Sequence, residues 1–206
     1  MVELLTNGPS DARNVLVLAH GAGGAMDSPF MNRVAGGVAA CGIRVVRFEF
    51  PYMAARRSGG KRGAPDREPV LLDAWRSVVE ELGGGPSLAI GGKSLGGRMA
   101  SLVAEELHVR TLICLGYPFH PPGQVEKLRT KHLAALRTRT LIVQGERDPF
   151  GTMAEVSRYE LSPSIQMEWL TDGDHSFKPR VSSGATENGN LSRSVELICQ
   201  FLLQAA

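Results

Sequence analysis

Residues 87–107, SLAIGGKSLGGRMASLVAEEL, constrain this chain most, because a short apolar run there meets an amphipathic one. The run 87–90 suits a buried strand, and the apolar residues from Met99 onward recur at helical spacing. Between them lies the serine turn, residues 92–96 (GKSLG), which has the pattern G-x-S-x-G. Such a turn predicts a strained backbone that lifts the Ser94 hydroxyl above the sheet edge. Its glycines are expected because side chains there would collide with the facing strand or helix.

Taken alone, the serine turn has two interpretations, an ordinary glycine-rich turn or the seat of a nucleophilic serine. Its position between a strand and a helix favours the nucleophile, since such a serine needs that context. The following helix would aim its N-terminal amides near Ser94, where they stabilise negative charge. A base, an orienting acid and an oxyanion site must then come from elsewhere in the chain.

Strand and helix patterns alternate along the sequence. Strands are predicted at 15–19, 44–50, 87–90, 111–116, 140–145 and 166–170, with an edge strand at 2–6. Helices are predicted at 28–40, 66–82, after the serine turn and at 191–203, whereas 52–67, 178–190 and most of 117–136 read as loops. This alternation predicts an α/β fold whose central, mostly parallel sheet is flanked by helices on both faces. The 206 residues are expected to form a single domain, 1–206.

In sheets of this kind the functional groups gather outside the carboxyl ends of the strands. Those ends carry residues 20–24 (HGAGG), Ser94, His120, Asp148 and His175. Ser94, Asp148 and His175 follow the chain order serine, acid, histidine that this architecture uses. A serine hydroxyl needs a histidine to remove its proton, and that histidine needs a carboxylate to hold its tautomer.

Several neighbouring residues have a structural and a functional interpretation. The glycine-rich loop, residues 20–24, is either a flexible connection or a set of fixed amides for an oxyanion. His20 is expected to pin that loop rather than act as a base, and Asp172 and Asp174 to shape the loop before His175. Lys93 is expected to face solvent and loop backbone, without a catalytic role. The basic stretch 52–67 is either a solvated segment or an overhang that attracts an anionic substrate.

Composition excludes some classes of protein. A net charge of +2 argues against a nucleic-acid or membrane-surface partner, and 43% hydrophobic residues are typical of a globular domain. Three distant cysteines without CxxC spacing predict reduced thiols. The absence of a signal-peptide pattern and of a long apolar segment adds to the expectation of a cytoplasmic protein. Residues 172–175 (DGDH) lack a second histidine or cysteine cluster, so neither a metal nor a cofactor is expected.

Five motifs together carry a family resemblance: HGAGG at 20–24, GGKSLGGRMAS at 91–101, YPFHPPG at 117–123, GERDPFG at 145–151 and GDHSF at 173–177. The chain resembles the α/β-hydrolase fold superfamily along nearly its full length. More narrowly, it is similar to small, lidless predicted hydrolases related to dienelactone hydrolase, a group with eukaryotic relatives in chromatin-associated complexes. The resemblance implies Ser94 as nucleophile, His175 as general base and acid, and Asp148 as its orienting carboxylate.

The resemblance also implies an oxyanion site made by the backbone amides of Leu95 and Ala22, with Gly23 as the alternative to Ala22. Only about twenty residues separate the strand at 111–116 from the next strand, so no cap domain is expected. An open site favours small acyl substrates. Gly23, Tyr117 and His120 are the expected substrate-binding residues.

We therefore expect a serine hydrolase that acts on a small carboxylic ester, thioester or lactone through an acyl-enzyme. The expected partner is a small-molecule acyl substrate. Acyl transfer to an acceptor other than water uses the same residues and stays open. The alternative from another class is a non-catalytic hydrolase-fold module that binds a protein or a small molecule.

Overall fold

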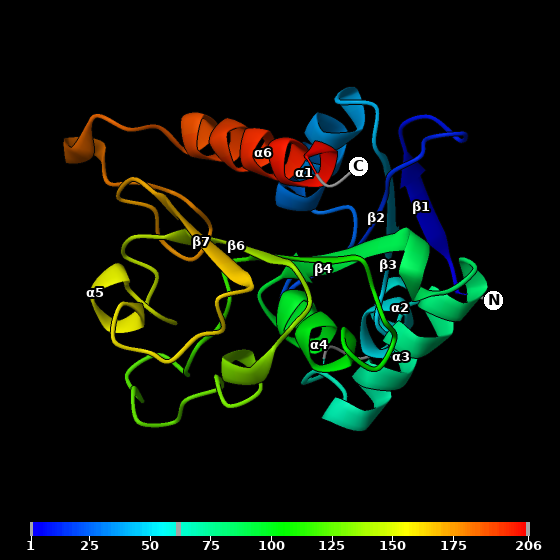
Figure 1. The fold of residues 1–206 in the computed structure, drawn as a ribbon, viewed down its shortest axis with the longest axis horizontal. Coiled ribbons are helices and arrows are strands. Elements are labelled where there is room, and N and C mark those ends of the chain that lie inside the picture. The colour runs from blue at the N-terminus through cyan, green and yellow to red at the C-terminus, as the bar shows by residue number, and fades with distance from the viewer. Residues whose placement is uncertain (1, 61–62, 205–206) are drawn as a thin grey trace.

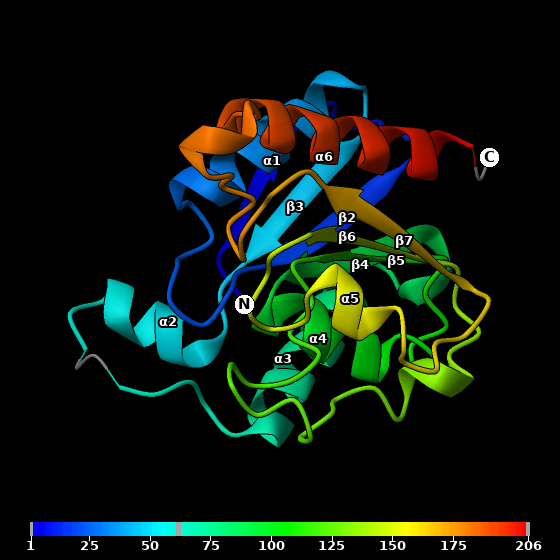
Figure 2. The same ribbon diagram turned by 90° about the vertical axis from the view of Figure 1, so that its left-hand side faces the viewer.

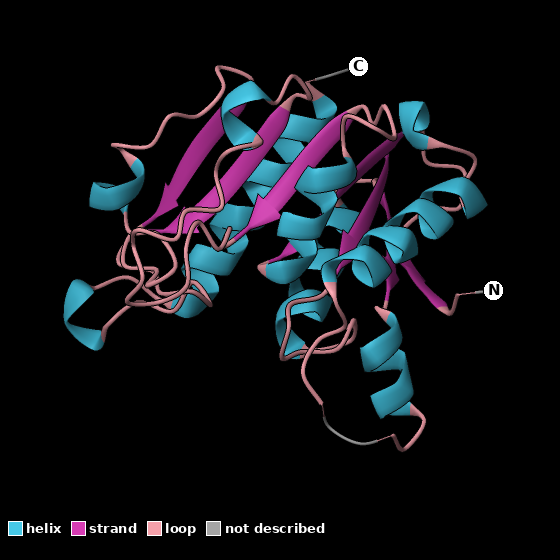
Figure 3. Cartoon of the chain, turned by 90° about the horizontal axis from the view of Figure 1, so that it is seen from below, coloured by secondary structure: helices cyan, strands magenta, loops and turns pink. Residues whose placement is uncertain are grey.

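The computed structural model describes residues 2–60 and 63–204. Within these ranges seven strands form one sheet in the order β1-β3-β2-β4-β5-β6-β7 (Figure 1). The strands are β1 Leu4–Asn7, β2 Val15–Ala19, β3 Arg44–Phe48, β4 Leu88–Lys93, β5 Thr111–Leu115, β6 Thr140–Gly145 and β7 Ile165–Leu170. The edge strand β1 runs antiparallel to β3, and every other neighbouring pair is parallel. The parallel strands point the same way in Figure 3, so their carboxyl ends share one edge.

Helices cover both faces of the sheet (Figure 2). Helices α1 (Pro29–Ala40) and α6 (Glu187–Leu203) lie side by side on one face, and α3 (Glu68–Glu81) and α4 (Leu95–Val103) lie on the other. Shorter elements connect them: α2 Pro51–Arg57, α5 Met153–Val156 and the 3-10 turns η1 Gly85–Ser87, η2 Leu133–Ala135 and η3 Val181–Ser183. The α/β architecture is the one that the alternating sequence pattern predicts.

The core consists of two apolar layers, one on each side of the sheet. Leu16 and Leu18 of β2 belong to the layer under α1 and α6, while Val17 and Ala19 belong to the layer under α3 and α4. Because both faces of the strands are buried, their sequences read as continuous apolar runs rather than alternating ones.

The basic stretch 52–67 is less irregular than its sequence suggests, because residues 51–57 form helix α2. Pro51 occupies the first turn, where its missing N–H costs nothing, and two alanines follow it. The helix ends at Arg57. Gly59 follows with a φ of 88°, which glycine readily adopts, and Gly60 N–H donates to the Ala55 carbonyl. Of the expected loop residues, 61–62 lie outside the described residues.

Helix α6 begins at Glu187, four residues before the predicted start at 191. The Thr186 side chain caps it by accepting from Gly189 N–H. The first turn, Glu-Asn-Gly-Asn, is polar, and so apolar spacing does not detect it. This early start brings the helix N-terminus to the edge where the parallel strands end.

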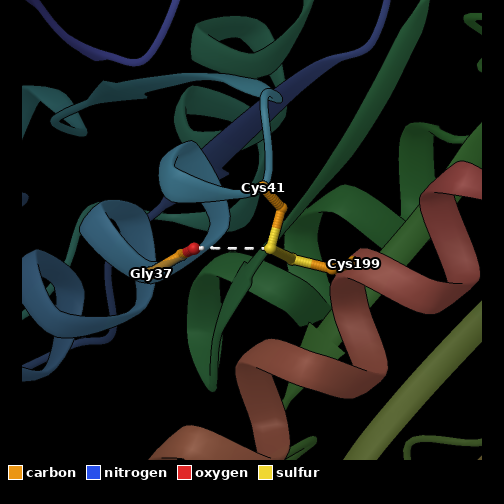
Figure 4. The surroundings of a disulfide bond; sticks show 3 residues. All are labelled: Gly37, Cys41 and Cys199. Carbon is orange, nitrogen blue, oxygen red and sulfur yellow. Dashed lines mark hydrogen bonds between the residues drawn. A yellow bond between two sulfur atoms is a disulfide. The ribbon is translucent and has the colours of Figure 1, made fainter.

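The expectation of three reduced thiols was wrong for two of them. Cys41 at the C-terminal end of α1 forms a disulfide with Cys199 of α6 (Figure 4). Their Cα atoms are 6.4 Å apart because the two helices pack against each other, whereas 158 positions separate them in sequence. The sequence spacing therefore gives no sign of the pairing. Figure 4 also shows the Gly37 carbonyl oxygen facing the Cys41 sulfur at 3.6 Å. Cys114 is free and buried, and burial raises the pKa of its thiol.

Residues 116–139, all of them described, connect β5 to β6 through loops and the single turn η2, so no cap domain is inserted there. Among the residues that the structure describes, no helix combines the length and the apolar composition that crossing a bilayer requires.

Candidate active site

The serine turn connects β4 to α4 and holds Ser94 in a conformation that side chains rarely adopt, with φ of 50° and ψ of −113°. A Cβ atom at Gly92 or Gly96 would overlap the Ala19 carbonyl oxygen of the neighbouring strand. Glycine at both positions therefore allows β2 and α4 to approach the turn. Ser94 N–H donates to the Leu115 carbonyl at 2.9 Å, which fixes the turn against β5.

Three side chains that are distant in the sequence meet at this edge. His175 Nε2 lies 2.9 Å from Ser94 Oγ, and His175 Nδ1 lies 2.7 Å from Asp148 Oδ2. The Asp148 side chain is fully buried, whereas that of His175 is 23% exposed. The Phe150 ring packs 4.2 Å from the imidazole, centre to centre. The imidazole thus bridges the serine hydroxyl and a buried carboxylate, as base-assisted nucleophilic attack requires.

The carboxylate of Asp148 is itself held by two donors. Phe150 N–H donates to Oδ1 at 2.9 Å, and Gln144 Nε2 donates to Oδ2 at 2.9 Å. The Gln144 side chain is fully buried and also accepts from Tyr117 N–H at 2.7 Å, which joins the end of β5 to the turn after β6. Sequence reasoning missed Gln144, because a glutamine at a strand end has no motif of its own.

Two largely buried side chains, His20 and Tyr52, donate hydrogen bonds to carbonyl groups of the glycine-rich loop. His20 is buried, donates through Nδ1 to the Gly21 carbonyl at 2.7 Å and accepts at Nε2 from Phe50 N–H at 3.1 Å. The bond from Phe50 N–H requires that Nε2 carries no proton, and burial lowers the pKa of His20 in the same direction. The Tyr52 hydroxyl donates to the Ala22 carbonyl at 3.1 Å, and burial raises the pKa of that hydroxyl to about 12. Tyr52 opens the basic stretch 52–67, and neither interpretation of that stretch predicts this contact.

Among the described residues the backbone amides of Ala22 and Leu95 donate to no acceptor, so both are free to bind an oxyanion. Gly23 lies beside Ala22 in the same loop, and both residues line the cavity next to Ser94. Leu95 opens helix α4, where the first N–H groups have no intrahelical partner. Fixed donors of this kind stabilise negative charge as it develops on an attacked carbonyl oxygen.

A cavity of about 620 Å³ opens beside Ser94 and His175. Its walls come from the glycine-rich loop, the first turn of α1, the start of α6 and the turns that carry Ser94, Asp148 and His175. The lining residues are Gly21, Ala22, Gly23, Gly24, Ser28, Pro29, Phe30, Met31, Lys93, Ser94, Phe150, His175, Ser176, Glu187 and Leu191. Most of the lining surface is apolar. A cavity of this size with apolar walls can hold a small organic molecule.

Tyr117 and His120, which were expected to bind substrate, do not line this cavity. Tyr117 is fully buried, packs against the Phe119 ring at 4.9 Å and donates to the Arg129 carbonyl. His120 is buried, its Nδ1 donates to the Pro121 carbonyl, and its Nε2 lies 3.5 Å from a Glu155 carboxylate oxygen. Both rings follow a buried strand and are used to pack the loop after β5.

Asp172 and Asp174 shape the loop that carries His175. Asp174 Oδ1 accepts from Ser176 N–H at 2.8 Å and Lys178 N–H at 3.0 Å. Asp172 pairs with Arg180, whose hydrogen bonds lower the pKa of Asp172 to about 2. Neither carboxylate is bonded to the imidazole, which Asp148 alone among the described residues contacts at Nδ1.

The described part of the basic stretch 52–67 does not line the cavity either. Arg57 forms ion pairs with Glu49 and Asp27, so its charge is neutralised within helix α2 and the loops beside it. Lys61 and Arg62 lie outside the described residues.

Lys93 departs most from expectation. Its side chain is buried rather than solvated, and burial lowers the pKa of its ammonium to about 8. This placement follows from the alternation of side chains along a strand. Lys93, the last residue of β4, points to the side of the sheet that α1 and α6 cover, next to Phe30 and Phe177.

Comparisons with a known protein family and with solved structures agree with this fold. The family described as alpha/beta hydrolase domain matches residues 12–203. A dienelactone hydrolase from Anabaena variabilis superposes with a TM-score of 0.74 at 20% identity, covering 98% of this chain and 92% of that one. An alpha-beta serine hydrolase homologue from Coxiella burnetii gives 0.70 at 19% identity, covering 97% and 90%. A serine hydrolase without lid from Xanthomonas campestris gives 0.64 at 18% identity, covering 98% and 86%.

Proposed function

The chain belongs to the alpha/beta hydrolase domain family, and we propose that it is a serine hydrolase acting on small carboxylic esters, thioesters or lactones. The observation that carries the proposal is the continuous line of hydrogen bonds from Ser94 through His175 to Asp148, 2.9 and 2.7 Å long. The cavity beside Ser94 gives an acyl group access to the hydroxyl.

In this mechanism His175 removes the Ser94 proton as Oγ bonds to the acyl carbon. The amides of Leu95 and Ala22, or Gly23 in place of Ala22, bind the oxyanion of the tetrahedral intermediate. The bond to the leaving oxygen or sulfur breaks as the imidazolium returns the proton to it. Water then attacks the acyl-enzyme by the same route, with His175 as base, which releases the acid and restores Ser94.

Asp148 stabilises the imidazolium and fixes the tautomer that presents Nε2 to Ser94. Its bonds from Phe150 N–H and Gln144 hold the carboxylate in the orientation that this role needs. The uncapped, largely apolar cavity supports a small substrate rather than a long chain that requires an enclosed tunnel.

Hydrolysis of short-chain 4-nitrophenyl esters, thioesters and lactones tests the proposal. We expect Ser94→Ala to lower kcat by at least about a thousandfold, and Asp148→Asn by about a hundredfold or more. Ser101→Ala is the matched control, because Ser101 lies on the same helix α4 but bonds the Arg98 carbonyl and His132 away from the cavity.

Turnover in the wild type that Ser94→Ala leaves unchanged would contradict the proposal. No turnover of any of these compounds by the wild type would favour the binding module instead.

A further inference from the structure

Lys93 is the last residue of β4, and its ammonium lies close to the Nδ1 edge of the His175 imidazole. A Cβ atom added to Gly116 would lie 2.7 Å from Lys93 Nζ and 3.4 Å from His175 Nδ1. The two nitrogens are therefore at most about 6 Å apart, and at that separation a charge on one affects the other inside a protein. Gly116, whose φ is 64°, carries no side chain that would keep them apart.

The place that this ammonium occupies is unfavourable for a charge. Nζ is sealed from solvent and has no hydrogen-bond partner among the described residues. It lies 5.6 and 5.9 Å from the centres of the Phe30 and Phe177 rings, which replace a small part of the lost hydration. An apolar side chain of similar length would fill the space without that cost. Because Nζ has no access to the cavity, binding of a ligand there does not account for the charge either.

Charged groups from several elements act on the imidazole of His175. They are Asp148 in the turn after β6, Asp174 in the loop before His175, Glu187 at the exposed start of α6 and Lys93 at the end of β4. Helix α1 and the end of β5 present uncharged groups, the Phe30 ring and the Gly116 backbone. The carboxylates favour a protonated imidazole, above all Asp148, which lies 2.7 Å from Nδ1, whereas the Lys93 ammonium opposes it. This opposition matters because a protonated imidazole cannot accept the serine proton.

We propose that the Lys93 ammonium offsets the Asp148 carboxylate and so keeps the His175 imidazole neutral, able to accept the serine proton, at and below neutral pH. Lys93 acts through His175 and is sealed from substrate, which makes it a positioning residue rather than a catalytic one. Burial lowers the pKa of Lys93 to about 8, so the ammonium is present at acidic and neutral pH and is lost as the pH rises through about 8. The inference rests on the proposed function and assigns the pH range in which that function operates.

The test is the pH dependence of kcat/KM for 4-nitrophenyl acetate between about pH 5 and 9, which reports the protonation of the free enzyme. Rates are normalised to fluorophosphonate-titrated sites. Lys93→Met keeps the length and apolar character of the stem and removes the charge. We expect its acid limb to lie about one pH unit above that of the wild type, since two like charges at this distance change a protonation equilibrium by about tenfold. The loss of activity should therefore be about tenfold at about pH 5.5 and absent at about pH 8.5.

Lys93→Gln separates charge from hydrogen bonding, because its amide is neutral and still donates. We expect it to move the acid limb as Lys93→Met does. Lys127→Met is the matched control, since Lys127 is exposed and does not line the cavity, and it should keep the wild-type profile. The proton resonance of His175 Nδ1–H provides a readout without substrate, and its pH midpoint should rise by about one unit in both neutral variants of Lys93.

Acid limbs and resonance midpoints that coincide in the wild type and both neutral variants would overturn the inference while leaving the serine hydrolase intact. A variant rate that falls by the same factor at every pH would also overturn it, because that result gives Lys93 a structural role. If the wild type turns over no ester and a fluorophosphonate does not label it, the proposed function fails, and the inference fails with it.

Discussion

The side-chain amide of Gln144 donates to Asp148 Oδ2 at 2.9 Å, the same carboxylate oxygen that lies 2.7 Å from His175 Nδ1. A neutral donor on that oxygen holds the carboxylate in place without competing for the charge of an imidazolium. Gln144 lies four residues before Asp148, at the end of β6, and bridges to β5 through Tyr117 N–H. The position of the acid thus depends on a residue that touches neither substrate nor serine.

Gln144→Met should therefore act on the catalytic step. We expect kcat to fall about tenfold or more with KM changed by less than about threefold, because Asp148 loses a positioning bond. Loss of a buried acceptor for Tyr117 N–H should also lower the unfolding free energy by about 1–3 kcal/mol. Kinetics normalised to fluorophosphonate-titrated sites separate the two effects, and Gln200→Met on the exposed side of α6 is the control. An unchanged kcat per titrated site would show that Gln144 only supports folding.

Tyr52→Phe removes the hydroxyl that holds the Ala22 carbonyl at 3.1 Å and leaves the buried ring in place. The glycine-rich loop would lose one fixed contact, worth about 1 kcal/mol. We expect kcat to fall about fivefold, since 1.4 kcal/mol corresponds to about tenfold in rate. Steady-state kinetics on a short-chain ester provide the measurement. A rate equal to that of the wild type would mean that the loop keeps its geometry without Tyr52.

His132 makes stability depend on pH. Burial, with the nearby Arg98 charge, lowers the pKa of His132 to about 4 from the ordinary 6.5. Below pH 6.5 the unfolded chain binds a proton at His132, whereas the folded chain binds that proton only below about pH 4. The stabilising contribution is therefore complete above pH 6.5 and is lost as the pH falls through this window.

The comparison that checks this effect is urea unfolding of the wild type and His132→Gln at pH 7, 5.5 and 4.5. The wild type should lose stability more steeply than the variant over that range. Part of the slope should remain in the variant, because burial lowers the pKa of His20 in the same direction. Equal slopes would contradict the assignment.

The Cys41–Cys199 disulfide closes a loop across 158 positions. It links the C-terminal parts of α1 and α6, whose N-terminal turns line the cavity. Chain entropy predicts that the double variant Cys41→Ser/Cys199→Ser loses about 2–5 kcal/mol of unfolding free energy. In protein purified without reductant and then denatured, a thiol reagent should detect the single free thiol of Cys114. Three reacting thiols would contradict the bond.

The sequence predicts much of this fold because its strands are buried on both faces. Val15–Ala19 and Thr140–Gly145 have the predicted bounds, since continuous apolar runs between turn residues leave little freedom. Helix α2 was missed because it has only seven residues and opens a stretch rich in arginine and glycine, and the first turn of α6 was missed because it is polar. Apolar spacing carries no information about such segments.

At the site, too, some residues can be predicted from the sequence and others cannot. Ser94, Asp148 and His175 stand in recognisable turns at strand ends, so their types and order can be read from the chain. Tyr117 and His120 stand at a similar strand end but turn into the packing of the following loop. The surroundings of Lys93, Gln144 and Tyr52 are formed by segments that are distant in the sequence. Which side of the sheet a side chain faces, and what it meets there, depends on tertiary structure.

The central claim is that Ser94 is an activated nucleophile, and intact mass after reaction with a fluorophosphonate tests it most directly. We expect the wild type to gain one phosphonyl adduct, with fragmentation placing it on Ser94. Ser94→Ala should gain none, and His175→Ala should react far more slowly. A wild type that stays unlabelled, or an adduct that maps to another residue, would contradict the account.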